Sequence, residues 1–123
     1  FNNSEQSILV KRKINIKKTK KIKIIDYIGS NSNFKKLDFF MSSILKKNRS
    51  EFIDIYSYGI SKKLLLASGF KEVKINSKII VPNHFEPLEY KNIKINCAYK
   101  ILGEKNKVRI FRGDGDGDRP SKI

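Results

Sequence analysis

The sequence predicts a mixed α/β (α+β) fold, in which a partly antiparallel β-sheet is flanked by one long and one short helix. Alternating apolar and polar residues in segments 7–17 and 21–28 are typical of half-buried strands. Apolar residues in segment 34–45 recur instead at the spacing of one helix face. With 123 residues, of which 39% are hydrophobic, the chain is long enough for one domain with its own core.

The first two strands are predicted to be antiparallel neighbours. Ser7–Lys17 alternates around Ile14 and Ile16, and Lys21–Ile28 does the same before it becomes more apolar. Only a short polar connection separates them, which favours a hairpin. Their lysines are then expected to lie on one face of the sheet or at its edge, where charge also discourages aggregation.

The next elements predict a βαβ crossover. Turn-forming residues at Gly29–Asn33 offer helix N-caps, and Phe34–Lys47 follows as an amphipathic helix of about four turns. Glu51–Tyr58 then alternates as a strand. A strand that follows a helix in this way pairs in parallel with the strand before the helix, here Lys21–Ile28.

A short helix is predicted between Ser61, its N-cap, and Gly69. Gly69 can take the left-handed conformation that ends a helix, and Phe70 can then fold back onto the last turn. Because a helix of about two turns is not stable alone, its leucines are expected to pack against the rest of the core.

The remaining chain is predicted to return to the sheet. Strands are expected at 71–75, 78–81 and 93–102, with a short end strand at 108–111. Pro82 and Pro87 interrupt this region, because neither fits within a central strand. Residues 1–113 are therefore predicted to form a single domain, and residues 114–123 an acidic tail rich in Gly and Asp.

The formal net charge of +15 suggests an anionic partner, since 27 Lys and Arg stand against 12 Asp and Glu. Codons rich in A and T specify Lys, Ile and Asn, so codon bias explains the same composition, and both interpretations stay open. Part of the positive charge is concentrated in the predicted hairpin. Its basic residues are Lys11, Arg12, Lys13, Lys17, Lys18, Lys20, Lys21 and Lys23.

The order of these elements, together with the sequence Ala67-Ser68-Gly69-Phe70, resembles the C-terminal half of the GNAT family of N-acetyltransferases. In that family a strand leads into a loop and a long helix, a parallel strand follows, and a short helix ends in a small residue, any residue, Gly and Phe. The resemblance covers residues 8–111 and implies that residues 1–113 are a GNAT-like domain or a degenerate relative. The family begins with further elements that build the acceptor site, so we expect these N-terminal elements to be missing.

The resemblance also implies a cofactor, acetyl-CoA or coenzyme A, and no metal. The family holds the pyrophosphate of this cofactor at the N-terminus of the long helix. Its loop there has Gln or Arg followed by two spaced glycines, whereas this chain has Gly29 alone. The residues expected to bind the cofactor are Ile28, Gly29, Ser30, Asn31, Ser32 and Asn33.

Proton transfer is predicted from four residues. The family often has a general-acid tyrosine on the short helix, where this chain has Leu65. Tyr56 and Tyr58, on the strand before that helix, are candidates to replace it. His84 and Glu86, between the two prolines, are the other candidates. Tyrosines on strands are also common packing residues, and a lone loop histidine is often incidental.

Two functions therefore stay open. The first is transfer of an acetyl or acyl group from acyl-CoA to an amine acceptor, such as an amino sugar, with little or no turnover expected of the fragment by itself. The second is a non-catalytic basic module that binds nucleic acid or another polyanion through the lysine-rich hairpin. Only Tyr27 lies near that hairpin, whereas base stacking needs interleaved aromatic residues, and this favours the first. A homodimer is a further open partner.

Other classes of site find little support. The single cysteine, Cys97, and the single histidine, His84, leave no zinc cluster to draw. Asp114–Asp118 departs from the EF-hand pattern, because Arg119 stands where that pattern needs Gly. The chain has no apolar run of about 18 residues and no signal segment, so a cytoplasmic location without a membrane span is expected.

Overall fold

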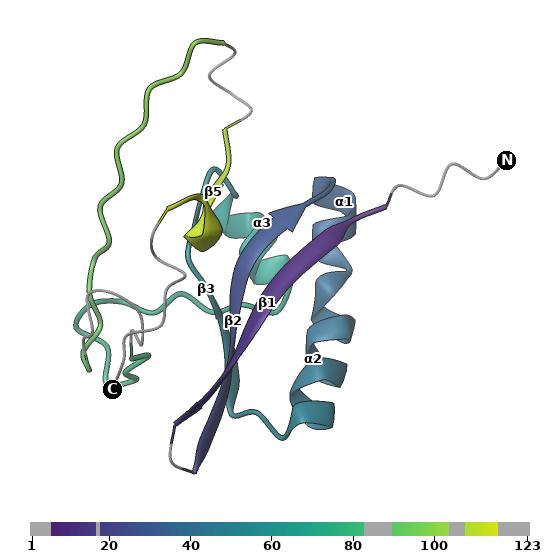
Figure 1. The fold of residues 1–123 in the computed structure, drawn as a ribbon, viewed down its shortest axis with the longest axis vertical. Coiled ribbons are helices and arrows are strands. Elements are labelled where there is room, and N and C mark those ends of the chain that lie inside the picture. The colour runs from purple at the N-terminus through teal and green to yellow at the C-terminus, as the bar shows by residue number, and fades with distance from the viewer. Residues whose placement is uncertain (1–5, 17, 83–89, 104–107, 116–123) are drawn as a thin grey trace, which may run out of the picture.

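The computed structural model describes residues 6–16, 18–82, 90–103 and 108–115. These residues form a mixed three-stranded sheet in the order β1-β2-β3 and a two-stranded sheet of β4 and β5 (Figure 1). The strands are β1 Ile8–Ile16, β2 Thr19–Ile28, β3 Phe52–Ile55, β4 Ser57–Tyr58 and β5 Ile110–Phe111. The helices are α1 Asn31–Lys35, α2 Leu37–Asn48, α3 Lys62–Ala67 and the 3₁₀ turn η2 Arg112–Asp114. The predicted mixed α+β class is confirmed.

The hairpin is antiparallel, as predicted. Its pairs run from Ile8 opposite Ile28 to Ile16 opposite Thr19. The register shifts between Val10 and Lys11, so that Ile25 of β2 has no partner in β1. This is a β-bulge, which adds local twist and redirects the strand beyond it.

The crossover is also confirmed, because β2 and β3 pair in parallel from Lys21 opposite Phe52 to Ile24 opposite Ile55. The predicted helix Phe34–Lys47 is confirmed from Leu37 onward as α2, but the prediction of one continuous helix was wrong. The Ser30 hydroxyl accepts a hydrogen bond from Asn33 N, so the first helix begins three positions earlier than expected, as α1. Lys36 N then bonds to Asn33 O at 3.0 Å, which closes α1 and separates it from α2.

The predicted ends of the short helix are confirmed. The Ser61 hydroxyl accepts a hydrogen bond from Leu64 N. Gly69 has φ +81°, and hydrogen bonds from Gly69 N to Leu66 O and from Phe70 N to Leu65 O complete a Schellman end. The Ser68 hydroxyl donates to Phe34 O at 3.0 Å, so α3 is fixed against α1.

The predicted strands after Phe70 were largely wrong. Segments 71–75, 78–81 and 93–102 contain no strand, and only β5 of the expected C-terminal strands forms. Four of their isoleucines remain exposed, Ile75, Ile79, Ile80 and Ile95, with Ile79 70% and Ile75 57% accessible, so their alternation with polar residues does not mark a buried face. The predicted strand Glu51–Tyr58 is divided at Tyr56 into β3 and β4.

The buried core joins the sheet to the helices. Phe34 of α1 is fully buried and meets Tyr27 of β2 edge to face, with ring centroids 4.9 Å apart. Leu64 of α3 and Phe111 of β5 complete the cluster. The carboxyl end of β2, the start of α1 and the short strand β5 are therefore held together.

Candidate functional site

A cavity of about 640 Å³ lies at the carboxyl end of β2. Pairing between β2 and β3 stops at Ile24 and Ile55, although β2 continues to Ile28. β4 pairs instead with β5, so the two parallel strands separate just where the bulge lies. The cavity is lined by Asp26, Tyr27, Ile28, Gly29, Asn31, Gly59, Val108, Arg109, Phe111 and Asp114.

The predicted cofactor loop forms one wall of this cavity, in part. Ile28, Gly29 and Asn31 line it, whereas Ser30, Ser32 and Asn33 do not. The Ser30 side chain instead caps α1. The Ser30 carbonyl accepts a hydrogen bond from the Tyr27 hydroxyl at 2.8 Å. The loop is therefore held in shape by hydrogen bonds of its own.

Gly29 is required here by close packing. A Cβ atom added at this position would lie 2.3 Å from Ser7 Oγ and 2.6 Å from the Tyr27 hydroxyl. Any side chain at this position would therefore have to displace Ser7, just before β1, and the Tyr27 hydroxyl.

Arg109 connects the opposite wall to this loop. Its Nη1 donates to the Gly29 carbonyl at 2.7 Å, and its Nη2 donates to Asn31 Oδ1 at 2.8 Å. Arg109 is the one basic side chain among the residues that line the cavity. It therefore supplies a fixed positive charge beside the predicted loop.

Two carboxylates also line the cavity. Asp26 Oδ1 accepts a hydrogen bond from Tyr27 N, and Asp114 Oδ2 accepts one from Phe111 N, each at 2.7 Å. A Cβ at Gly113 would lie 3.7 Å from Asp26 Cβ, so η2 packs closely against the end of β2. The lining of the cavity thus contains one cation, Arg109, and two carboxylates.

The wall that carries Arg109 rests on a tight contact at Gly59. Gly59 has φ +81°, and a Cβ there would lie 2.0 Å from the Val108 carbonyl oxygen. Glycine is needed here because other residues rarely adopt this positive φ and because any side chain would clash with Val108. This contact and the pairing of β4 with β5 keep residues 108–111 beside the separated strands.

The structure does not bring the two predicted catalytic tyrosines to the cavity. Tyr58 is half-exposed, and its hydroxyl accepts a hydrogen bond from the Tyr99 hydroxyl at 2.6 Å. The guanidinium carbon of Arg112 lies over the Tyr56 ring, 3.9 Å from the centroid of that ring. Neither tyrosine lines the cavity. His84 and Glu86 lie outside the described residues.

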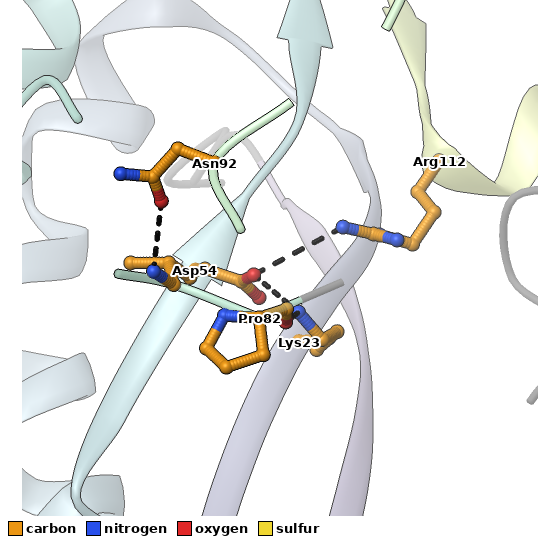
Figure 2. Close-up of polar contacts among 6 residues, drawn as sticks. Lys23, Asp54, Pro82, Asn92 and Arg112 are labelled. Atoms are coloured by element: carbon orange, nitrogen blue, oxygen red, sulfur yellow. Dashed lines mark hydrogen bonds and ion pairs between the residues drawn. The ribbon is translucent and has the colours of Figure 1, made fainter. Parts of the chain in front are cut away.

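A buried charge cluster lies on β2 and β3, where sequence reasoning did not expect one (Figure 2). Lys23 is fully buried and donates to Asp54 Oδ2, and to the Pro82 carbonyl at 3.4 Å. Arg112 Nη2 lies 3.9 Å from the same carboxylate oxygen, with its side chain 2% exposed. Asp54 therefore stands between two buried cations.

The segment that covers this cluster is fixed by Asn92. Its side-chain carbonyl accepts a hydrogen bond from Val81 N at 2.9 Å (Figure 2). Its amide donates to Lys74 O and Ile79 O. Pro82 is thereby positioned over Lys23. Among the described residues Asp54 Oδ1 has no hydrogen-bond partner.

Burial changes the pKa values in this cluster. It lowers the pKa of Lys23 below the usual 10.5, although the charge and hydrogen bond of Asp54 oppose the change. It raises the pKa of Tyr56 above the usual 10.0, and the charge of Asp54 adds to this effect. A tyrosine with a raised pKa remains protonated and is a weak acid.

We expect the free energy of unfolding to increase with pH between the folded-state pKa of Lys23 and 10.5. In that window the unfolded chain binds the lysine proton more tightly than the folded chain does. Urea denaturation at pH values from about 7 to 10 measures this increase in the free energy of unfolding. The series stops at pH 10 because the raised pKa of Tyr56 lowers the free energy of unfolding at higher pH. Lys23→Met should lack the increase, and the exposed control Lys46→Met should keep it. An equal increase in Lys23→Met would contradict the assignment.

The basic hairpin exposes only part of its charge. Lys23 is fully buried and Lys21 is 8% exposed, with its ammonium 5.3 Å from the Phe52 ring centroid. Lys11, Lys13, Lys18 and Lys20 are exposed, and Lys17 lies outside the described residues. The expectation that the lysines lie on one face or at an edge therefore holds for Lys11 and Lys13 on the edge strand β1, and it was wrong for Lys21 and Lys23 of β2, which are buried.

Within the part of the chain that the structure describes, no helix has the length and apolarity needed to cross a membrane. The same residues contain no group of His, Cys, Asp and Glu that could hold a metal ion. Comparison with protein-family models, with curated proteins and with solved structures found no match to this chain.

Proposed function

We propose that this chain is a GNAT-like domain that binds acyl-CoA and serves the transfer of the acyl group to an amine acceptor. One observation carries the proposal. The cavity opens where two parallel strands separate beside a β-bulge, and Ile28, Gly29 and Asn31 of the predicted cofactor loop line it. Ligands of α/β sheets bind characteristically at the carboxyl ends of separated parallel strands.

The cavity offers a partner for each part of the cofactor. Arg109, fixed by Gly29 and Asn31, would pair with the pyrophosphate. Beyond Ile24 the edge of β2 that faces β3 no longer pairs with it, so the amide groups of a pantetheine arm could bond there as an added strand does. A volume of about 640 Å³ is within the usual range for small-molecule sites.

The carboxylates suit the second substrate. Asp26 and Asp114 would attract the ammonium of the acceptor and take its proton before the amine attacks the thioester carbonyl. The C–S bond then breaks, and the thiolate needs a proton.

Of the residues predicted to handle protons, Tyr56 and Tyr58 do not line the cavity, and His84 and Glu86 lie outside the described residues. Because Leu65 stands where the family often has its acid tyrosine and the acceptor-site elements of the family are expected to be missing, we expect binding of the cofactor with little turnover by this chain alone.

Calorimetric titration with coenzyme A tests the cofactor site. Arg109→Gln should weaken binding by about 10-fold or more, because hydrogen bonds to charged groups contribute about 1.5–3 kcal/mol. Lys46→Gln, which removes the same charge from the far end of α2, is the matched control and should bind as the parent does. Ser32→Glu adds a negative charge to the first turn of α1. It should also weaken binding, because the pyrophosphate is negative too. Pantetheine, which lacks the pyrophosphate, should bind more weakly than coenzyme A.

Two results would refute the proposed cofactor site, and a third would refute only the expected low turnover. The first is no detectable heat with coenzyme A in the parent protein. The second is an equal affinity of the parent and Arg109→Gln. The third, rapid thiol release from acetyl-CoA with a simple amine acceptor, would leave the binding site standing and refute only the expected low turnover.

A further inference from the structure

A second hollow, which we call the basic groove, lies at the opposite end of β2 from the cavity. It has a volume of about 260 Å³. Lysines from three elements converge on it: Lys13 from β1, Lys20 from β2 and Lys47 from the last turn of α2. Asn15, Asn48 and Ser50 complete its lining.

The fold fixes these lysines in one place. Lys13 stands opposite Ile22, and Asn15 stands opposite Lys20. Directly opposed residues point to the same side of a sheet, and so do alternate residues along a strand, so Lys13, Asn15 and Lys20 share one face. The hairpin extends past the C-terminal end of α2 (Figure 1), and Lys13, Asn15 and Lys20 are exposed.

The end of α2 is tied to the same face. Arg49 has φ +50°, and Ser50 N bonds to Leu45 O at 3.1 Å, which ends the helix beside the hairpin. Glu51 N then bonds to Lys20 O at 2.8 Å. Lys47 is thereby held at the groove by the backbone around it.

The charge of the groove is uncompensated by the residues that form it. Its lining contains three ammonium groups and no carboxylate. Among the described residues none of these three lysines takes part in an ion pair. Like charges gathered in one hollow repel one another, and this repulsion costs electrostatic free energy. An anion bound between the three ammonium groups would make the electrostatic free energy favourable.

The lining also supplies neutral donors. The Asn48 amide donates to the Ile44 carbonyl at 2.7 Å, which fixes its side chain at the end of the helix. Asn15 and Ser50 add an amide and a hydroxyl group to the wall. Ammonium, amide and hydroxyl groups are the usual partners of phosphate oxygens.

We propose that the basic groove binds phosphate groups of a polynucleotide backbone. A backbone is favoured over a single phosphate because the positive charge continues beyond the groove, to Lys11 along the same strand and to Lys46 on α2. No aromatic side chain lines the groove, so base stacking is not available and recognition is indifferent to sequence. This site is separate from the acyl-CoA cavity and does not depend on it.

The test measures binding of a fluorescein-labelled single-stranded DNA of about 20 nucleotides by fluorescence anisotropy, over a range of salt concentrations. The triple variant Lys13→Gln, Lys20→Gln, Lys47→Gln should bind about 10- to 100-fold more weakly at 0.1 M salt. Its slope of log affinity against log salt should be smaller in magnitude by about 2, as expected for three lost phosphate contacts.

The matched control is Lys71→Gln, Lys74→Gln, Lys78→Gln, which removes the same charge from exposed residues outside the groove. It should keep the salt slope of the parent. A second labelled strand of different sequence should bind with the same affinity. Circular dichroism checks that both triple variants keep the fold.

Equal losses in the two triple variants would overturn the proposal, since net charge alone would then account for binding. Strong discrimination between the two strands would also overturn it. Inorganic phosphate should displace the DNA no better than chloride at equal ionic strength. Full displacement by phosphate at low millimolar concentration would instead identify a site for a small phosphate compound. The groove variant, Lys13→Gln, Lys20→Gln, Lys47→Gln, should bind coenzyme A with the affinity of the parent. This titration therefore tests the groove independently of the cavity.

Discussion

Replacing Asp54 with Ala is expected to lower the free energy of unfolding by about 3–5 kcal/mol. The change removes the carboxylate shared by Lys23 and Arg112, whose side chains are 0% and 2% exposed. Both cations stay buried in a medium that stabilises charge poorly. Urea denaturation followed by far-UV circular dichroism measures the loss.

Two variants sharpen this test. Glu72→Ala breaks an ion pair with Lys62 whose side chains are 54% and 68% exposed, and it should change stability little. The triple variant Lys23→Met, Asp54→Leu, Arg112→Met removes every charge of the cluster together. It should be close to the parent in stability or above it, because buried ions are often replaced by apolar groups without loss. A small effect of Asp54→Ala alone would show that the cluster is solvated.

Phe34→Ala should also lower the free energy of unfolding by about 3–5 kcal/mol. Phe34 is 0% exposed, packs edge to face on Tyr27, and lies in the cluster that joins β2, α3 and β5. The truncation would leave a cavity beneath α1 and remove the aromatic contact.

Phe39→Ala is the matched control for this truncation, since Phe39 is 86% exposed on α2. Chemical denaturation of both variants and the parent gives the comparison. Phe39→Ala should leave stability within about 0.5 kcal/mol of the parent. Equal effects of the two truncations would contradict the described core.

Elements that depend on neighbouring residues were predictable from the sequence. The Ser61 cap, the left-handed Gly69 and the alternation of β1 and β2 are all local signals, and the structure confirms them. The break at Lys36 was missed because an amphipathic spacing continues across it, while Ser30 begins a separate helix earlier. After Phe70 the alternation of Ile and Lys has no partner strand, so strand propensity alone gave wrong assignments.

The candidate site was predictable only for the residues that are neighbours in sequence. Ile28, Gly29 and Asn31 were expected from the loop itself, and they line the cavity. Arg109 and Asp114 come from a segment far along the chain, and nothing in the sequence pairs them with that loop. A signal for the charge cluster did exist, since Lys23 interrupts the apolar run of β2, but sequence alone could not show that both faces of this strand are covered.

The contact between β4 and β5 has a consequence for the order in which the molecule assembles. It joins Tyr58 to Ile110, whereas the hairpin is built from near neighbours in sequence. Closing so long a segment costs more chain entropy than closing a hairpin, and distant pairings slow folding. Only two residues on each strand pair, so the segment that carries Arg109 is expected to join late in folding. Its position in the folded molecule then depends on Phe111 in the core and on the bonds from Arg109 to Gly29 and Asn31, so the last contacts to form are the ones that complete the cavity.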